Sequence, residues 1–176
     1  MAISIRDAAD ADLPAALEIF NREVVASPYL YVETPVTIDD RRKWLDQHRV
    51  ANMPVLVATE PDEPAQILGY ASLSPYRPSS GYRFTGEVSV YVAPFAQRRG
   101  IGSRLLSSLS DEAQARGLHA LVASIDSENA PSVALFERRG FAEVARLVEV
   151  GWKFGQWRTQ LLFLRILSAN STSVGE

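Results

Sequence analysis

The sequence contains no cysteine and only two histidines, His48 and His119, among its 176 residues. Without cysteine there can be no disulfide, thiolate zinc site, iron–sulfur cluster or cysteine nucleophile. Two imidazoles cannot supply the three-histidine site of many zinc hydrolases, so we expect no metal. The absence of cysteine is also compatible with a reducing compartment.

An excess of charge of one sign and long apolar runs are missing as well. The net charge is −3, and the 18 Lys and Arg residues are scattered along the chain, so we expect no nucleic-acid partner. No apolar run approaches the ~18 residues of a membrane span, and the first residues show no basic segment followed by an apolar stretch. We therefore expect a cytoplasmic protein without a membrane partner.

The composition that is present, 47% hydrophobic and 22% charged, is typical of a globular domain. The length predicts one domain over residues 1–167, followed by a disordered C-terminal tail at 168–176.

Apolar periodicity and turn residues predict the element order β, α, α, β, β, β, α, β, α, β, β. Strands are expected at 3–6, 54–59, 67–73, 87–92, 118–125, 146–154 and 159–167, and helices at 13–24, 38–50, 101–116 and 130–139. The residues 60–65 are expected to form a turn, and 74–81 a surface loop. Hairpin neighbours together with crossover helices predict an α/β fold, a mixed sheet of about seven strands flanked on both faces by about four helices.

A glycine-rich loop follows the strand at 87–92 and opens the next helix, with the sequence Gln97-Arg98-Arg99-Gly100-Ile101-Gly102. Glycines allow backbone N–H groups to approach a ligand, and the helix N-terminus and two arginines favour a diphosphate there. The spacing is neither the triphosphate-binding loop nor the dinucleotide pattern. Taken alone, the motif is equally compatible with a simple turn whose arginines are solvated.

Two motifs together resemble the GNAT acetyltransferase superfamily. Residues 97–102 match its acetyl-CoA loop, Q/R-x-x-G-x-G/A, and Asn129 with the later run Phe136-Glu137-Arg138-Arg139-Gly140-Phe141 matches its second motif. Within the superfamily, the chain is similar to the phosphinothricin and methionine sulfone (methionine sulfoximine) N-acetyltransferases. Among the segments that carry this similarity are Tyr76-Arg77-Pro78, Gly81-Tyr82-Arg83, Glu87 with Ser89–Val92, and 151–157.

The resemblance implies a GNAT fold that binds acetyl-CoA as cosubstrate where two parallel strands splay apart. The implied cofactor-binding residues are Val90, Tyr91, Val92, Arg98, Arg99, Gly100, Ile101, Gly102, Ser103, Asn129 and Ser132. Asn129 is an equally good N-cap for the helix that follows it, and both roles can hold.

Glu87 is the candidate catalytic residue, because an ammonium must lose a proton before its nitrogen attacks a thioester. The candidate substrate-binding residues are Arg77, Pro78, Ser79, Arg83, Glu87, Val88 and Ser89. A guanidinium suits a substrate carboxylate, which is the role proposed for the two arginines. Without the family resemblance, these charges would be interpreted as ordinary surface residues.

The chain departs from the family pattern at two places. Phe136 stands where relatives place a Tyr or His that protonates the departing thiolate, so water, Tyr91 or no acid at all must serve. Val88 stands where relatives often have His, and 29–32 also differs, which leaves the substrate open. The resemblance of the aromatic segment 151–157 to the family implies homodimerisation.

These observations predict an acetyl-CoA-dependent N-acetyltransferase that acts on the α-amine of a small amino acid by direct transfer, since no acyl-enzyme nucleophile stands out. One alternative is the same fold acting on a protein N-terminus or another amine. A second alternative, suggested by Phe136, is a CoA-binding domain without turnover.

Overall fold

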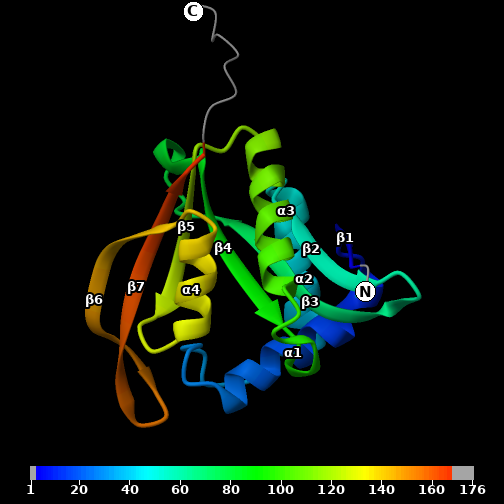
Figure 1. Ribbon diagram of the computed structural model, residues 1–176, viewed down its shortest axis with the longest axis horizontal. Helices are drawn as coiled ribbons and strands as arrows, with labels where there is room; N and C mark the ends of the chain where they lie inside the picture. The colour runs from blue at the N-terminus through cyan, green and yellow to red at the C-terminus, as the bar shows by residue number, and fades with distance from the viewer. Residues whose placement is uncertain (1–2, 168–176) are drawn as a thin grey trace, which may run out of the picture.

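The computed structural model describes residues 3–167, which form a seven-stranded sheet with helices on both faces (Figure 1). The tail expected at 168–176 lies outside the described residues. The strands run in the spatial order β1-β2-β3-β4-β5-β7-β6. They are β1 Ser4–Asp7, β2 Val55–Glu60, β3 Glu63–Pro75, β4 Thr85–Val92, β5 Ala120–Asp126, β6 Ala142–Lys153 and β7 Gln156–Ile166.

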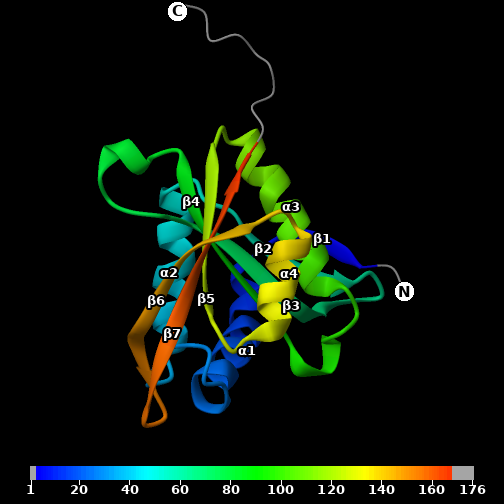
Figure 2. The ribbon, with the colours of Figure 1, turned by 60° about the vertical axis from the view of Figure 1, so that its left-hand side comes forward.

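Two helices cover each face of this sheet. Helices α1 (Leu13–Ala26) and α2 (Ile38–Val50) lie on one face, and α3 (Ile101–Ala115) and α4 (Ala130–Arg138) on the other (Figure 2). The largest buried cluster includes Leu105, Leu106 and Leu109 of α3, together with apolar residues of the central strands. The predicted mixed α/β sheet with helices on both faces is confirmed.

The helix ends follow from local sequence. Thr37 caps α2, since its hydroxyl accepts a hydrogen bond from the Asp40 N–H at 3.2 Å, and the Asp40 carboxylate accepts one from the Thr37 N–H. Asp12, just before α1, accepts hydrogen bonds from Arg6 at 2.7 and 2.8 Å and from the Ala9 N–H. It therefore ties the helix entry to β1.

Strands β3 and β6 are longer than their apolar patterns predict. Strand β3 starts at Glu63, so the turn after β2 is much tighter than the expected 60–65. It also extends to Pro75, into the expected loop, and β6 starts at Ala142. These extensions are polar or exposed, and backbone pairing with β2, β4 and β7 defines them, which side-chain periodicity does not report.

The feature that positions the site is a fork between β4 and β5. These two strands are parallel and pair over only three positions, with Thr85–Glu87 facing 120–122. Beyond them, β4 continues beside β3 and β5 continues beside β7. The residues 88–92 therefore present one backbone edge to a gap, which is unusual in the middle of a sheet.

Candidate active site

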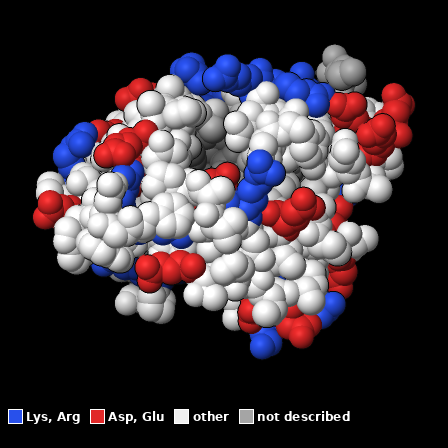
Figure 3. Space-filling view, turned by 90° about the horizontal axis from the view of Figure 1, so that it is seen from below, with Lys and Arg blue, Asp and Glu red and all other residues white. Residues whose placement is uncertain are grey.

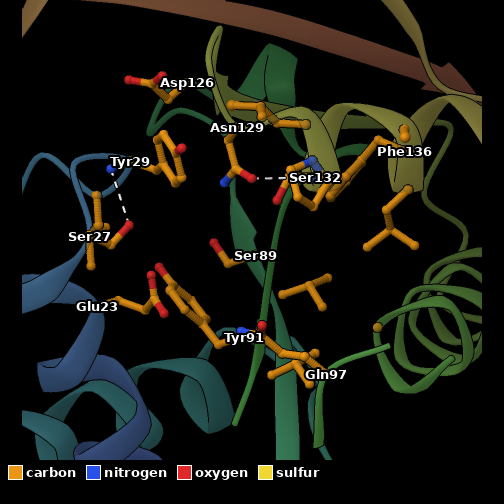
Figure 4. A pocket seen from close by; sticks show the side chains of 18 of the residues that line it. Glu23, Ser27, Tyr29, Ser89, Tyr91, Gln97, Asp126, Asn129, Ser132 and Phe136 are labelled. Atoms are coloured by element: carbon orange, nitrogen blue, oxygen red, sulfur yellow. Dashed lines mark hydrogen bonds between the residues drawn. The ribbon is translucent and has the colours of Figure 1, made fainter. Parts of the chain in front are cut away.

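A cavity of about 800 Å³ lies at this fork (Figure 4). Its lining comes from the second half of α1 and the residues after it, from β4, from the start of α3, from the end of β5 and from α4. These segments are far apart in the sequence, and the fork brings them together on both faces of the sheet.

One end of the cavity is suited to an anion. Gly100, with φ +76°, and Arg98, with φ +61°, shape the turn into the 15-residue helix α3, whose first N–H groups have no partner within the helix. Gly102, Ser103 and Arg138 also line this end. Figure 3 shows a row of Lys and Arg along the margin of a hollow.

Most of the predicted cofactor-binding residues line this cavity. They are Val90, Tyr91, Val92, Arg98, Gly100, Ile101, Gly102, Ser103, Asn129 and Ser132. Arg99 does not line it and forms an ion pair with Glu60 of β2. The glycine-rich loop therefore has the geometry of an anion site, with Arg98 as the arginine that faces the cavity.

The open edge of β4 can hold an extended ligand. Beyond Glu87, backbone N–H and C=O groups of 88–92 on this edge have no partner in β5. An amide-containing ligand entering the gap could pair with them in the manner of a strand, which suits the pantetheine arm of CoA.

Asn129 caps α4, because its Oδ1 accepts a hydrogen bond from the Ser132 N–H at 3.2 Å (Figure 4). The capping interpretation is therefore confirmed. The same two residues also line the cavity, so the cap does not exclude a contact with a ligand.

Glu87 is the last β4 residue paired with β5, and its carboxylate accepts a hydrogen bond from the Ser124 hydroxyl at 3.1 Å. Strand alternation places Glu87, Ser89 and Tyr91 on the face of β4 that carries α1. Val88 and Ser89 line the cavity, whereas Glu87 itself stands beside the lining at the fork.

Tyr91 is held firmly at the cavity wall. Its ring stacks on Tyr70 at 5.0 Å and meets Phe20 edge-on at 5.7 Å. Burial raises the pKa of Tyr91 to about 12, with the carboxylates of Glu23 and Glu87 adding to the rise and Arg41 opposing it. The phenol therefore keeps its proton at neutral pH and can donate it.

Phe136 lines the cavity but belongs to the apolar core. It is buried and packs edge-to-face on Phe141, with ring centroids 5.0 Å apart. It has no proton to donate, as expected from its side chain.

Four predicted substrate-binding residues lie outside the cavity lining, on the segment between β3 and β4. Arg77 lies over the rings of Tyr76 and Tyr82, and Arg83 lies over Phe84 and donates to the Ser80 carbonyl at 3.2 Å. Pro78 and Ser79 belong to the same exposed segment. In a single chain these residues are not brought to the residues that line the cavity.

Polar residues that sequence reasoning missed also line the cavity, among them Glu23, Tyr29 and Asp126. Asp126 is buried and accepts two hydrogen bonds from Arg158, at 2.8 and 2.7 Å, and one from the Tyr31 hydroxyl. Burial works to raise the pKa of Asp126, but these hydrogen bonds outweigh it and lower the pKa. The position of Asp126 at the carboxyl end of a central strand was the available signal, whereas Glu23 on α1 gave none.

Residues 3–167 contain neither a metal-ligating cluster nor a membrane-spanning helix. No group of three or more His, Cys, Asp or Glu side chains in this range is arranged to hold a metal ion. None of the helices in the same range is long and apolar enough to cross a membrane.

Comparison with known proteins decides the family. Residues 17–141 match the model of the acetyltransferase (GNAT) family. The chain belongs to the GNAT family. The resemblance stated from the two sequence motifs is thereby confirmed.

Individual relatives of this GNAT chain agree in sequence and in fold. It is 42% identical, over 94% of its length and 95% of the relative's, to the L-methionine sulfoximine/L-methionine sulfone acetyltransferase of Pseudomonas aeruginosa. A solved phosphinothricin acetyltransferase from Sinorhizobium meliloti in complex with acetyl-CoA is 30% identical with a TM-score of 0.92, over 100% and 95% of the two chains. A ribosomal-protein-alanine N-acetyltransferase structure from Brucella melitensis is 43% identical with a TM-score of 0.89, over 93% and 99%.

Proposed function

We propose that this GNAT protein transfers the acetyl group of acetyl-CoA to the α-amine of a small amino acid or analogue such as methionine sulfone, methionine sulfoximine or phosphinothricin. The observation that carries the proposal is the cavity at the β4–β5 fork. Its lining includes the start of α3, which is suited to an anion, and the strand β4 from Val88 onward, with Glu87 beside it at the fork. The chain is 42% identical to a methionine sulfoximine/sulfone acetyltransferase.

The cofactor half of the site fits acetyl-CoA in charge and shape. Residues 98–103 would hold the pyrophosphate, the free edge of Val90–Val92 the pantetheine arm, and Asn129 with Ser132 would add polar contacts. Bound acetyl-CoA supplies the activated thioester, and the residues around it bind, orient and move protons.

Glu87 is assigned the role of general base. Its carboxylate stands at the fork, on the α1 face of β4, and the Ser124 hydroxyl holds one of its oxygens. It can take the proton of the substrate ammonium directly or through water. Tyr91 or water returns a proton to the thiolate, since Phe136 cannot.

Arg77 and Arg83 are assigned to the substrate carboxylate. Both guanidinium groups are exposed, and neither forms an ion pair with any residue of the described range. Each could therefore pair with an anion that approaches the segment between β3 and β4, which lies outside the cavity lining of its own chain.

Release of CoA thiol tests the proposed function directly. The purified protein is incubated with acetyl-CoA and each of methionine sulfone, methionine sulfoximine, phosphinothricin and the common amino acids. We expect release that depends on the amino acid, with the N-acetylated product detected by mass spectrometry. Cofactor binding without release from any amine would support the non-catalytic alternative.

A second candidate substrate is a protein N-terminus, which the likeness to the Brucella melitensis enzyme favours. Peptides with a free N-terminal alanine, assayed beside the amino acids, separate the two. A higher kcat/KM for the peptides than for every free amino acid would establish the second candidate in place of the first.

We also propose a homodimer, in which the β6–β7 hairpin of one subunit packs on the hairpin, or on a neighbouring face, of the other subunit. Val148, Val150 and Trp157 are 66%, 55% and 61% exposed, an apolar surface that a monomer rarely leaves in water. Light scattering after size exclusion should give twice the chain mass, and Trp157→Glu should give the single mass.

The cytoplasmic location stays a prediction that cell fractionation tests.

A further inference from the structure

One carboxylate in the cavity has no part in the function described above. Glu23 lies in the last turns of α1 and lines the cavity. Figure 4 shows its carboxylate directed inward, beside the Tyr91 hydroxyl and across from Ser89. Within residues 3–167 its side chain accepts no hydrogen bond and forms no ion pair.

The other charges of the cavity are accounted for. Four charged side chains line it, namely Glu23, Arg98, Asp126 and Arg138. Asp126 is paired with Arg158 through two hydrogen bonds. Arg98, in the loop that starts α3, and Arg138, the last residue of α4, lie at the anion end of the cavity, on the cofactor side.

On the α1 side, Arg41 is buried, lies over the rings of Phe20, Trp44 and Tyr70, and donates to the Tyr70 hydroxyl. Arg22 of α1 is exposed and forms no ion pair among the described residues. The negative charge of Glu23 is thus available to whatever enters the cavity from this side.

The position of Glu23 separates it from the reacting amine. Glu87, Ser89 and Tyr91 form a row along one face of β4, and four residues at about 3.3 Å each put the Cα atoms of Glu87 and Tyr91 roughly 13 Å apart. Glu87 marks the end at the fork, and Glu23 stands beside Tyr91 at the other end. An amino acid whose amine is served by Glu87 would extend its other parts along this row toward Glu23.

We propose that Glu23 selects the acceptor by binding a hydrogen-bond donor or positive charge at the end of its side chain. The inference rests on the proposed function and deepens it. An ionised carboxylate is only an acceptor of hydrogen bonds, so it favours an N–H or ammonium group and disfavours an anion. The acceptor class is therefore amino acids with a donor-bearing or cationic side-chain end, with anionic side chains selected against.

Two nearly isosteric acceptors test this assignment. Methionine sulfoximine has an N–H where methionine sulfone has an oxygen, and phosphinothricin carries an anionic phosphinate. We expect kcat/KM in the order sulfoximine, sulfone, phosphinothricin. In Glu23→Gln the sulfoximine advantage should fall by roughly tenfold and phosphinothricin should gain about as much, because a charged contact is worth roughly ten- to hundredfold.

The controls separate this inference from the proposed function. Glu18→Gln removes an exposed carboxylate from the same helix and should leave all three values unchanged. Calorimetric titration of the sulfoximine and the sulfone into the CoA complex should show the same preference in Kd, lost in Glu23→Gln.

Equal losses on all three acceptors, or none, would overturn the assignment of Glu23 while leaving the acetyltransferase activity established. Absence of turnover with every amino acid in the parent protein would overturn the proposed function, and the Glu23 assignment with it.

Discussion

At the scale of single residues, the proposed chemistry depends on Glu87, which lies at the point where two strands separate. Its backbone still belongs to the parallel pairing, which fixes the strand, while its carboxylate meets the Ser124 hydroxyl across the fork. A base held in this way is oriented without being buried, so it can exchange protons with water after each turnover.

Replacing this carboxylate should damage chemistry and spare binding. Glu87→Gln is expected to lower kcat by roughly 10²- to 10⁴-fold, and the deficit should shrink as the pH rises and more substrate amine is neutral. Steady-state assays between about pH 6 and pH 9, the range in which α-amines begin to lose their protons, measure the kcat deficit at each pH. Turnover equal to that of the parent at neutral pH would place the base elsewhere.

The residues of the site differ in how far sequence could predict them. Glu87 and the loop 97–103 could be found because they follow one another along the chain and carry a motif. Glu23 and Asp126 come from α1 and from the end of β5, and only the fork brings them to one cavity. Neither spacing nor composition links residues so far apart in the sequence.

At the scale of elements, the start of α3 depends on a left-handed residue. Gly100 has φ +76°, and a Cβ built there meets nothing within 4 Å. A side chain at this position would therefore destabilise the fold through backbone strain and not through a steric clash. A β-branched residue at such a position costs about 1–2 kcal/mol and redirects the N–H groups that face the anion end.

We expect Gly100→Val to abolish the rise in Tm that acetyl-CoA produces. In the parent this rise reflects about 2.7 kcal/mol at a hundredfold excess over Kd. Gly117→Val is the matched control, because Gly117 lies just after α3, has the same φ of +76° and also has open space around it. A normal acetyl-CoA shift in Gly100→Val would remove the loop from the cofactor site.

A second element-scale contact joins the β6–β7 hairpin to the segment after α1. Tyr31 of that segment lies over Gly151, and its hydroxyl donates to Asp126 at 2.8 Å. The buried Lys153 ammonium donates to the carbonyls of Val24, at 2.6 Å, and Val32. The hairpin thereby fixes the wall that carries Tyr29.

Gly151→Ala should break this contact. The new Cβ would lie 2.4 Å from the Tyr31 ring, so the ring must move and lose its bond to Asp126. We expect a loss of about 1–3 kcal/mol in urea unfolding. Gly81→Ala, where a Cβ meets nothing within 4 Å, should be close to neutral. Tyr31→Leu combined with Gly151→Ala should cost less than the two changes summed, whereas simple additivity would contradict the contact.

The element order could be predicted from sequence because apolar periodicity and cap residues are local signals. Thr37 caps the start of α2, and Gly117 and Gly140, both with positive φ, follow the ends of α3 and α4. The extent of β3 and β6 could not be predicted, since their added residues are exposed and only the partner strand makes them extended. The three-position contact between β4 and β5 is likewise a property of the sheet.

At the scale of the whole molecule, two buried carboxylates govern acid stability. Hydrogen bonds from Arg6 and Ala9 lower the pKa of Asp12 against the opposing effect of burial, and those from Arg158 and Glu128 do the same for Asp126. A carboxyl whose folded pKa lies below its unfolded pKa stabilises the fold above the unfolded pKa. That stabilisation is lost as the pH falls through the folded pKa.

We therefore expect the free energy of unfolding to be level near neutrality and to fall once the pH drops below about 4, the ordinary pKa of Asp. Asp126→Asn should be less stable than the parent at neutral pH and should show a shallower fall in acid. Urea unfolding from about pH 3 to pH 7 measures the stability at neutral pH and its fall in acid, because this range includes the ordinary Asp pKa of about 4. An equally steep fall in the variant would mean that other carboxyls dominate.

The short pairing between β4 and β5 divides the sheet into two halves. One half contains β1–β4 and the other contains β5, β7 and β6, and the two are hydrogen-bonded to each other at one end only. The β4–β5 pairing is where the fewest backbone hydrogen bonds resist a movement of one half of the sheet relative to the other. A ligand that enters the gap and pairs with the free β4 edge would take the place of the missing strand partner. Cofactor binding would then stiffen the protein, because the two halves of the sheet would be joined along the whole gap instead of at one end.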